Sequence, residues 1–325
     1  MKLALIALSL LLCRFSAAAT QIKIAALIPE GTSWGNSVKK FSQEVEAATK
    51  GEVTIKVFYG GVAGDEPDVL RKIRVGQLHG GIFTGKTLAD IYPDVRVMEI
   101  PFTFYGDQKK AGAVMDRLTP KFDAGFKKKG FVNLGFYELG LVYLVSTKKV
   151  TNLDELKGIK IWTWEGDELS RAMIESLELV SVPLALPDVL SSLSTGIINA
   201  AYAPPLGILA LQWHTKIKYL VDFPTTFSIG ALLLSDKTWT KVNPHHQKLI
   251  KEIAAKYVKE ANAKSQVENE EARAQMKKSG IEFVSFPESD YKKASALRAS
   301  VVKKLVDRNI VSAGMVQEFD KEVKK

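Results

Sequence analysis

Trp162 and Trp164 are the residues of this 325-residue chain whose types and spacing first suggest a site. They stand two apart in LKGIKIWTWEGDEL, residues 156–169, which has the pattern of a turn, a short strand and a polar exit. Side chains two apart on a strand point to the same face, so the two indoles would lie side by side. Such a pair offers apolar contact and stacking to a bound molecule. Packing in the core or between domains is the alternative role.

Residues for catalysis or metal binding are scarce. The adjacent His245 and His246 would face different directions on a helix. The glycines at 60, 61 and 64 lack the Lys-Ser/Thr that completes a phosphate loop. No serine stands in a nucleophile elbow, and no carboxylate has zinc-site spacing. The sequence therefore predicts no enzyme, no metal site and no cofactor.

The elements that must position the indoles begin with a β-α-β-α-β series. Val38, Phe41, Val45 and Ala48 recur at helical spacing, and Gly51 follows as the expected end. A second helix is predicted at 66–75, and strands at 22–28, 53–57 and 80–83. This order is typical of a parallel sheet covered by helices, an α/β fold.

The second half again alternates predicted strands and helices, and it adds one long helix. Asn243 and Pro244 form a good helix start, and no glycine or proline follows until Gly280. A helix of about 35 residues would be roughly 50 Å long, enough to lie across two domains. Strands are predicted at 132–136, 142–145, 159–162, 182–184 and 197–202, and helices at 167–177 and 188–194.

The N-terminus has the pattern of a secretory signal. Lys2 precedes an apolar run that ends at Cys13, the only cysteine, and small residues up to Ala19 follow. We predict a signal peptide at 1–19 and a periplasmic mature chain without disulfides. Lipidation at Cys13 is the less favoured alternative, because leucines rather than a small residue precede it.

The net charge of the chain is +9. Lysines are scattered among glutamates along the predicted helices, which is typical of a solvated surface. The basic balance therefore does not indicate nucleic-acid binding.

Four segments, in this order, resemble the DctP-type solute-binding proteins of tripartite ATP-independent periplasmic (TRAP) transporters. They are TKGEVTIKVFYGGVAGDEPDVLRKIRVGQLHGGIF (49–83), YPDVRVMEIPFTF (92–104), NLDELKGIKI (152–161) and VPLALPDVLSSLSTGIINA (182–200). The resemblance implies a two-domain periplasmic-binding-protein clamp with discontinuous domains and a long helix spanning both. On that basis we predict domain I at 20–141 plus about 229–267, and domain II at 142–228 plus about 268–325.

The chain departs from this family where the family's ligand contacts are expected. Trp162 and Val142 stand where the resemblance implies two arginines that hold a ligand carboxylate. Ala203 replaces an asparagine, and Asn199 with Ala200 replaces Asp-Gly. Burying a carboxylate without a cation costs several kcal/mol, whereas a tryptophan can bury about 150–250 Å² of apolar surface. We therefore expect a hydrophobic, aromatic or neutral ligand.

The remaining candidate ligand contacts are weaker. Trp34 lies in the first glycine-bordered loop, where the resemblance places contacts. Tyr202 and Phe83 suit a cleft or a buried strand, and Glu138 suits a cleft or the surface. Asn199 is a candidate for a retained hydrogen bond to the ligand.

The resemblance implies a protein that closes on a small molecule and delivers it to the TRAP membrane permease subunits. Two alternatives stay open at this point. One is a ligand-sensing or interaction subunit with a periplasmic partner protein. The other is a conventional carboxylate binder that uses a different cation.

Overall fold

The computed structural model describes residues 19–325. The predicted signal peptide at 1–19, including Cys13, lies outside the described residues except for Ala19. Within the described part, no helix combines the length and the apolar character needed to cross a membrane.

The first lobe is built on three parallel strands. β1 pairs with β2 on one side and β3 on the other, and α1 packs on β2. Val38, Phe41 and Val45 of α1 are buried as predicted. The helix begins at Ser33, before this apolar stripe, because the Thr32 side chain caps it. The bounds are β1 Thr20–Ala26, α1 Ser33–Ala48, β2 Val53–Phe58, α2 Glu66–Arg74, β3 Gly80–Thr84 and α3 Gly85–Ile91.

The second lobe is a mixed group of strands with its own helices. β5 pairs in parallel with β6 and β7, and β8 pairs with β10. The strands predicted at 182–184 and 197–202 are displaced by a few residues in the structure, where they form β6 and β7. Gly196 ends α6 in a left-handed conformation. The bounds are β5 Lys160–Thr163, α5 Glu168–Ser176, β6 Val180–Pro183, α6 Val189–Thr195, β7 Ala200–Ala203, α7 Pro205–Ala210, β8 Tyr219–Val221, β10 Glu282–Val284 and α10 Glu288–Asp307.

Two long strands join the lobes into one sheet of order β2-β1-β3-β9-β4-β7-β5-β6. β4 spans Phe131–Ser146 and β9 spans Thr226–Ser235, in antiparallel pairing. The predicted separate strands at 132–136 and 142–145 are therefore wrong in one respect, because β4 is continuous. Its pairing shifts next to Gly135 and Gly140, whose φ angles are positive, so glycines make irregularities here instead of a strand end.

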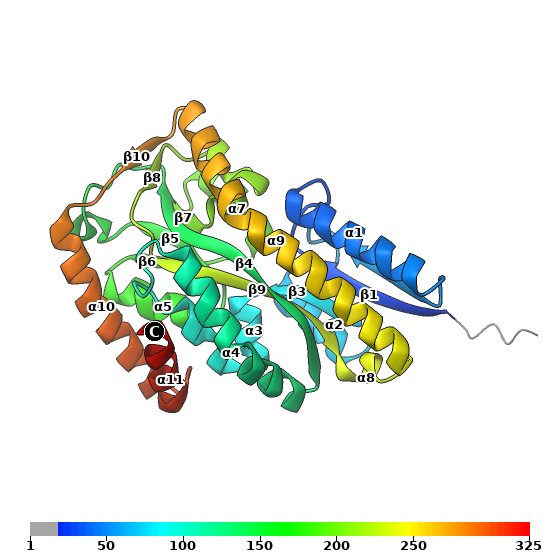
Figure 1. Ribbon diagram of the computed structural model, residues 1–325. Coiled ribbons are helices and arrows are strands. Elements are labelled where there is room, and N and C mark those ends of the chain that lie inside the picture. The colour runs from blue at the N-terminus through cyan, green and yellow to red at the C-terminus, as the bar shows by residue number, and fades with distance from the viewer. Residues whose placement is uncertain (1–18) are drawn as a thin grey trace, which may run out of the picture.

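The long helix α9, Pro244–Lys278, confirms the prediction from the sequence. Asn243 caps it by accepting a hydrogen bond of 2.9 Å from the His245 backbone N–H. In Figure 1 α9 runs diagonally from beside α1 to the end of the second lobe. The remaining elements are α4 Gln108–Lys128, α8 Asp236–Trp239, α11 Ala313–Val323 and the short 3-10 helices η2 Pro93–Glu99, η3 Leu153–Leu156, η4 Leu186–Asp188 and η5 Trp213–Thr215.

The fold is therefore a two-lobed α/β structure with a helix across both lobes, as predicted. β4 and β9 cross between the lobes, so each lobe draws on separate stretches of the chain. The residue boundaries given above for the two domains stay a prediction.

Candidate functional site

A cavity of about 170 Å³ lies between the lobes. β3 of the first lobe and β5 of the second both contribute to its wall, together with the segments that follow them. The wall is mostly apolar, with a small number of charged side chains. Its principal side chains are Leu27, Trp34, Glu66, Phe83, Lys86, Arg96, Glu99, Leu139, Val142, Trp162, Trp164, Asp167, Ser170, Met173, Leu186, Tyr202, Ala203 and Trp213.

Aromatic rings from the second lobe form one wall. The Trp162 ring lies 5.0 Å from that of Trp164, 5.5 Å from that of Trp213, and 5.1 Å from that of Tyr202, on which it stacks. Trp162 is only 2% exposed, and its indole N–H donates to the Leu184 carbonyl at 3.0 Å. Trp162 therefore has a packing role, while the less buried Trp164 offers more ring surface to the cavity.

A buried group of three charges forms a second wall. The Arg96 guanidinium donates to Glu99 and, at 2.6 Å, to Oδ1 of Asp167. Burial opposes the charge of Arg96, but the carboxylates of Asp167 and Glu99 outweigh it and raise its pKa. Burial raises the pKa of Glu99, against the attraction of Arg96. Arg96 is thus held as a cation between two acids.

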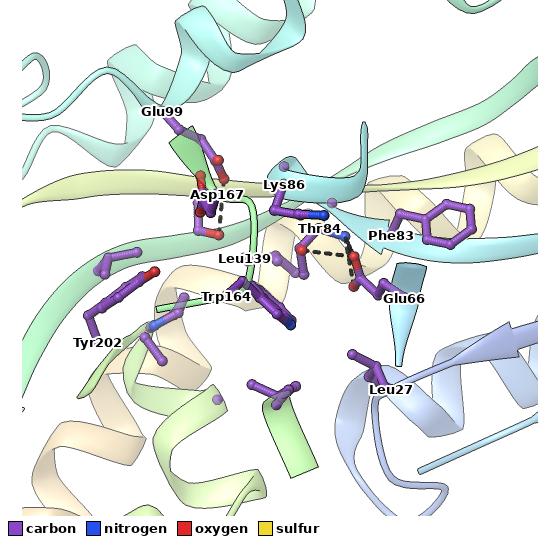
Figure 2. Close-up of a pocket in the computed structure, with 18 of the residues that line it drawn as sticks. Leu27, Glu66, Phe83, Thr84, Lys86, Glu99, Leu139, Trp164, Asp167 and Tyr202 are labelled. Carbon is purple, nitrogen blue, oxygen red and sulfur yellow. Dashed lines mark hydrogen bonds between the residues drawn. The ribbon is translucent and has the colours of Figure 1, made fainter. Parts of the chain in front are cut away.

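Glu66 and Lys86 complete the charged lining. The Glu66 carboxylate accepts hydrogen bonds from the backbone N–H of Thr84, at 3.0 Å, and from its hydroxyl. Burial raises the pKa of Glu66 to about 7, despite these donors. Lys86 donates to Asp90 at 2.7 Å. Figure 2 shows Glu99 beside Asp167, with the Trp164 and Tyr202 rings below this pair in the view, and, separately, Glu66 bonded to Thr84.

Two sets of polar contacts cross the cleft. Arg96 of η2, in the first lobe, binds Asp167, which begins α5 in the second lobe. Asp65, which caps α2 of the first lobe, accepts from the indole N–H of Trp164 at 3.0 Å and from the backbone N–H of Leu186 at 3.4 Å. These contacts hold the lobes together around the cavity.

Comparison with known proteins identifies solute-binding proteins, which is consistent with a cavity between two lobes. The family model of the bacterial extracellular solute-binding proteins, family 7 (DctP), matches residues 24–309. The chain belongs to this family. A solute-binding protein of Verminephrobacter eiseniae is 23% identical over 83% of this chain and 80% of its own length. The 2,3-diketo-L-gulonate-binding periplasmic protein YiaO of Escherichia coli is 22% identical over 77% of this chain and 76% of its own.

Solved structures show the same fold. The sugar acid binding protein DctPAm of Advenella mimigardefordensis, in complex with galactonate, gives a TM-score of 0.88 at 18% identity, covering 95% of this chain and 99% of that one. A TRAP periplasmic solute-binding protein of Xanthobacter autotrophicus with bound β-D-galacturonate gives 0.85 at 21% identity, covering 94% and 99%. Family 7 members and these neighbours are solute-binding proteins rather than enzymes.

Most of the predicted contact residues of this DctP member reach the cavity, although ligand binding by each stays a prediction. Seven line it, namely Trp34, Phe83, Val142, Trp162, Trp164, Tyr202 and Ala203. Glu138 does not, because its carboxylate lies against Gly112 of α4; burial raises its pKa to about 7. Asn199 also lies outside the lining, at the turn before β7.

Sequence reasoning missed the charged lining. It treated the site as lacking cations, yet Arg96 and Lys86 both line the cavity. The available signal was Arg96 and Glu99, three apart within the otherwise apolar stretch VRVMEIPF, because charges in such a stretch need partners. Among the described residues there is no group of three or more histidine, cysteine, aspartate or glutamate side chains that could hold a metal ion.

Proposed function

We propose that this DctP protein works in the periplasm, where it captures a neutral, aromatic or otherwise hydrophobic organic molecule between its lobes and delivers it to TRAP permease subunits. The family supports capture and delivery, since its TRAP members bind small molecules for membrane permeases. The class of ligand is inferred from the cavity.

The pairing of the lining cations carries this proposal. Arg96 already has two carboxylate partners, and Lys86 has Asp90. The lining also contains more acids than cations, namely Glu66, Glu99 and Asp167 against Lys86 and Arg96. A ligand carboxylate would add another negative charge to this buried set without a free cation, and burying an unpaired charge is strongly unfavourable.

The aromatic wall supplies apolar contacts that favour the binding of such a ligand. Trp164, Tyr202 and apolar side chains such as Leu27 and Leu186 line the same space. A second, smaller apolar cavity of about 20 Å³ also includes Tyr202 and Met173 in its wall. The unbranched, adaptable side chain of Met173 suits a ligand whose apolar part extends in that direction.

A conventional carboxylate binder is the second candidate. Solved neighbours contain acids, among them β-D-galacturonate and, in a protein of Desulfovibrio salexigens, orotic acid. In this chain Arg96 or Lys86 would be the cation, and each would have to exchange a protein carboxylate for that of the ligand.

Mass spectrometry of the molecule that co-purifies with the mature protein separates the two candidates. We expect a neutral apolar molecule, retained by the wild type and depleted in Trp164→Ala. Tyr105→Ala is the matched control, because it removes an aromatic ring that does not line the cavity. A sugar acid or other small carboxylate, bound by the wild type and insensitive to Trp164→Ala, would instead establish the second candidate.

A further inference from the structure

The Asp167 carboxylate occupies a complete anion-binding position. Its Oδ1 accepts from Nη2 of Arg96 at 2.6 Å and from the backbone N–H of Ser170 at 3.2 Å, and its Oδ2 accepts from the Ser170 hydroxyl at 2.6 Å. The side chains of Arg96 and Asp167 are each 6% exposed. A guanidinium, a helix N-terminal N–H and a hydroxyl would suit a ligand carboxylate equally well.

The two acids bound to Arg96 are not equivalent. Glu99 belongs to the same short helix as Arg96, and its Oε1 also accepts from the Ile229 backbone N–H at 3.0 Å. The Glu99 carboxylate lies so close to Gly85 that a Cβ there would collide with it. Glu99 is therefore fixed within the first lobe. Asp167 reaches Arg96 from the second lobe, so it is the partner that separates when the lobes part.

From this geometry we propose that Asp167 is a specificity-determining residue, whose carboxylate takes the position on Arg96 that a ligand carboxylate would otherwise occupy. The protein thereby supplies its own anion for closure and leaves the ligand to bind through apolar contacts. This inference rests on the proposed function and adds the residue that excludes acids from the site.

The charge balance explains how the exclusion works. Arg96 with Glu99 alone forms a neutral pair, and Asp167 is the second acid on the same guanidinium. A ligand carboxylate can reach Nη2 of Arg96 only by displacing Asp167 into a buried setting without its cation. Removing the Asp167 carboxylate opens that position, and a ligand acid then restores the arrangement of charges found in the native protein.

Asp167→Ser is the variant that tests this inference. Serine is a good N-cap, so α5 keeps its capping residue while the carboxylate is lost and its space is freed. Asp167→Asn is the matched control, because the amide is neutral but fills the same space. The probes are benzoate and benzamide, which share one aromatic ring and differ in charge, and their dissociation constants are measured by calorimetry on the full mature chain.

We expect the wild type to bind benzamide more tightly than benzoate. In Asp167→Ser the ratio of the two dissociation constants should shift toward benzoate by roughly tenfold or more, as expected for a new charge-assisted contact. In Asp167→Asn the shift should stay below about threefold, since the amide blocks Nη2 of Arg96. No shift in a folded Asp167→Ser protein, or an equal shift in both variants, overturns the inference.

Formate provides a second readout if Asp167→Ser is poorly folded. At equal ionic strength, formate in place of chloride should raise the melting temperature of Asp167→Ser, or restore its folding, and leave the wild type unchanged. Absence of this rescue overturns the inference. A wild type that prefers benzoate to benzamide would contradict the proposed function instead, and the shift caused by Asp167→Ser is scored separately from that preference.

Discussion

The charged and the aromatic side chains of the cavity come mainly from different lobes. Glu66, Lys86, Arg96 and Glu99 belong to the first lobe, where most of their polar atoms already have partners in the chain. Trp162, Trp164, Tyr202 and Trp213 belong to the second lobe, where Trp162 and Trp213 are buried and Trp164 and Tyr202 offer more ring surface to the cavity. The charged side chains are therefore largely paired within the protein, whereas the aromatic side has contact surface to offer.

This difference fits a division in which closure uses charged and hydrogen-bonding atoms, whereas recognition uses ring surfaces. The Arg96–Asp167 and Asp65–Trp164 contacts join the lobes without a ligand atom. Under the proposed function, the ligand then needs only to fit the apolar space. Four predictions test this division, beginning with the largest expected effect.

Arg96→Met should lower the free energy of unfolding by about 3–5 kcal/mol, because it leaves Glu99 and Asp167 buried beside each other without a cation. Urea denaturation at pH 7 measures this change. The control is Lys39→Met, which breaks the exposed pair with Glu30 and should change stability by less than about 1 kcal/mol. Equal effects of the two substitutions would show that the buried charges are not a structural unit.

Glu66 should make the protein less stable as pH rises. The unfolded chain loses this proton near pH 4.5, while the folded protein keeps it until about pH 7. Between these values the folded state binds more protons, so its contribution to stability falls with rising pH, by about 1–3 kcal/mol in total.

Glu66→Gln should remove this part of the slope when unfolding is followed from pH 4.5 to 7.5. Glu138→Gln is the control. Burial also raises the pKa of the Glu138 carboxyl to about 7, but Glu138 lies outside the cavity lining. Both variants should flatten the stability profile, and only Glu66→Gln should change the pH dependence of benzamide binding. The same pH dependence of benzamide binding in both variants would show that Glu66 does not contribute to the binding site.

Trp164→Phe should weaken benzamide binding by about 0.5–1.5 kcal/mol, since it keeps an aromatic ring but removes the indole N–H that binds Asp65. Calorimetry measures the affinity. Trp34→Phe is the comparison, as Trp34 also lines the cavity and its indole N–H has no hydrogen bond to a described residue. A larger loss in Trp34→Phe would place the important ring in the first lobe.

Asn199→Ala should have the smallest effect. Its side chain lies outside the cavity lining, so the affinity for benzamide should change by less than about 0.5 kcal/mol. A loss of tenfold or more would mean that the ligand extends beyond the cavity toward the turn before β7.

The sequence predicted the elements whose signals are local. α9 follows from Asn243, Pro244 and the absence of later breakers, and α1 follows from its buried stripe. β4 was divided wrongly because glycines at an irregular pairing resemble glycines at a strand end. Pairing with β9, which continues from Phe131 to Val142 across both irregularities, keeps that segment extended as one strand.

The apolar part of the site was also visible in the sequence. The same-face spacing of Trp162 and Trp164 is a property of any strand, and the resemblance placed it at a ligand site. The charged part of the site was not visible in the sequence, because Arg96 and Asp167 lie 71 residues apart in the chain and on different lobes.

The sequence by itself determined the long helix α9, the buried stripe of α1 and the family, since these depend on neighbouring residues or on ordered motifs. The tertiary structure alone decided how the cations of the cavity are paired. A charge in a sequence has no assigned partner until folding brings an acid to it and burial makes that pairing obligatory. At this site, that pairing converts Arg96 from an apparent anion receptor into a contact between the lobes.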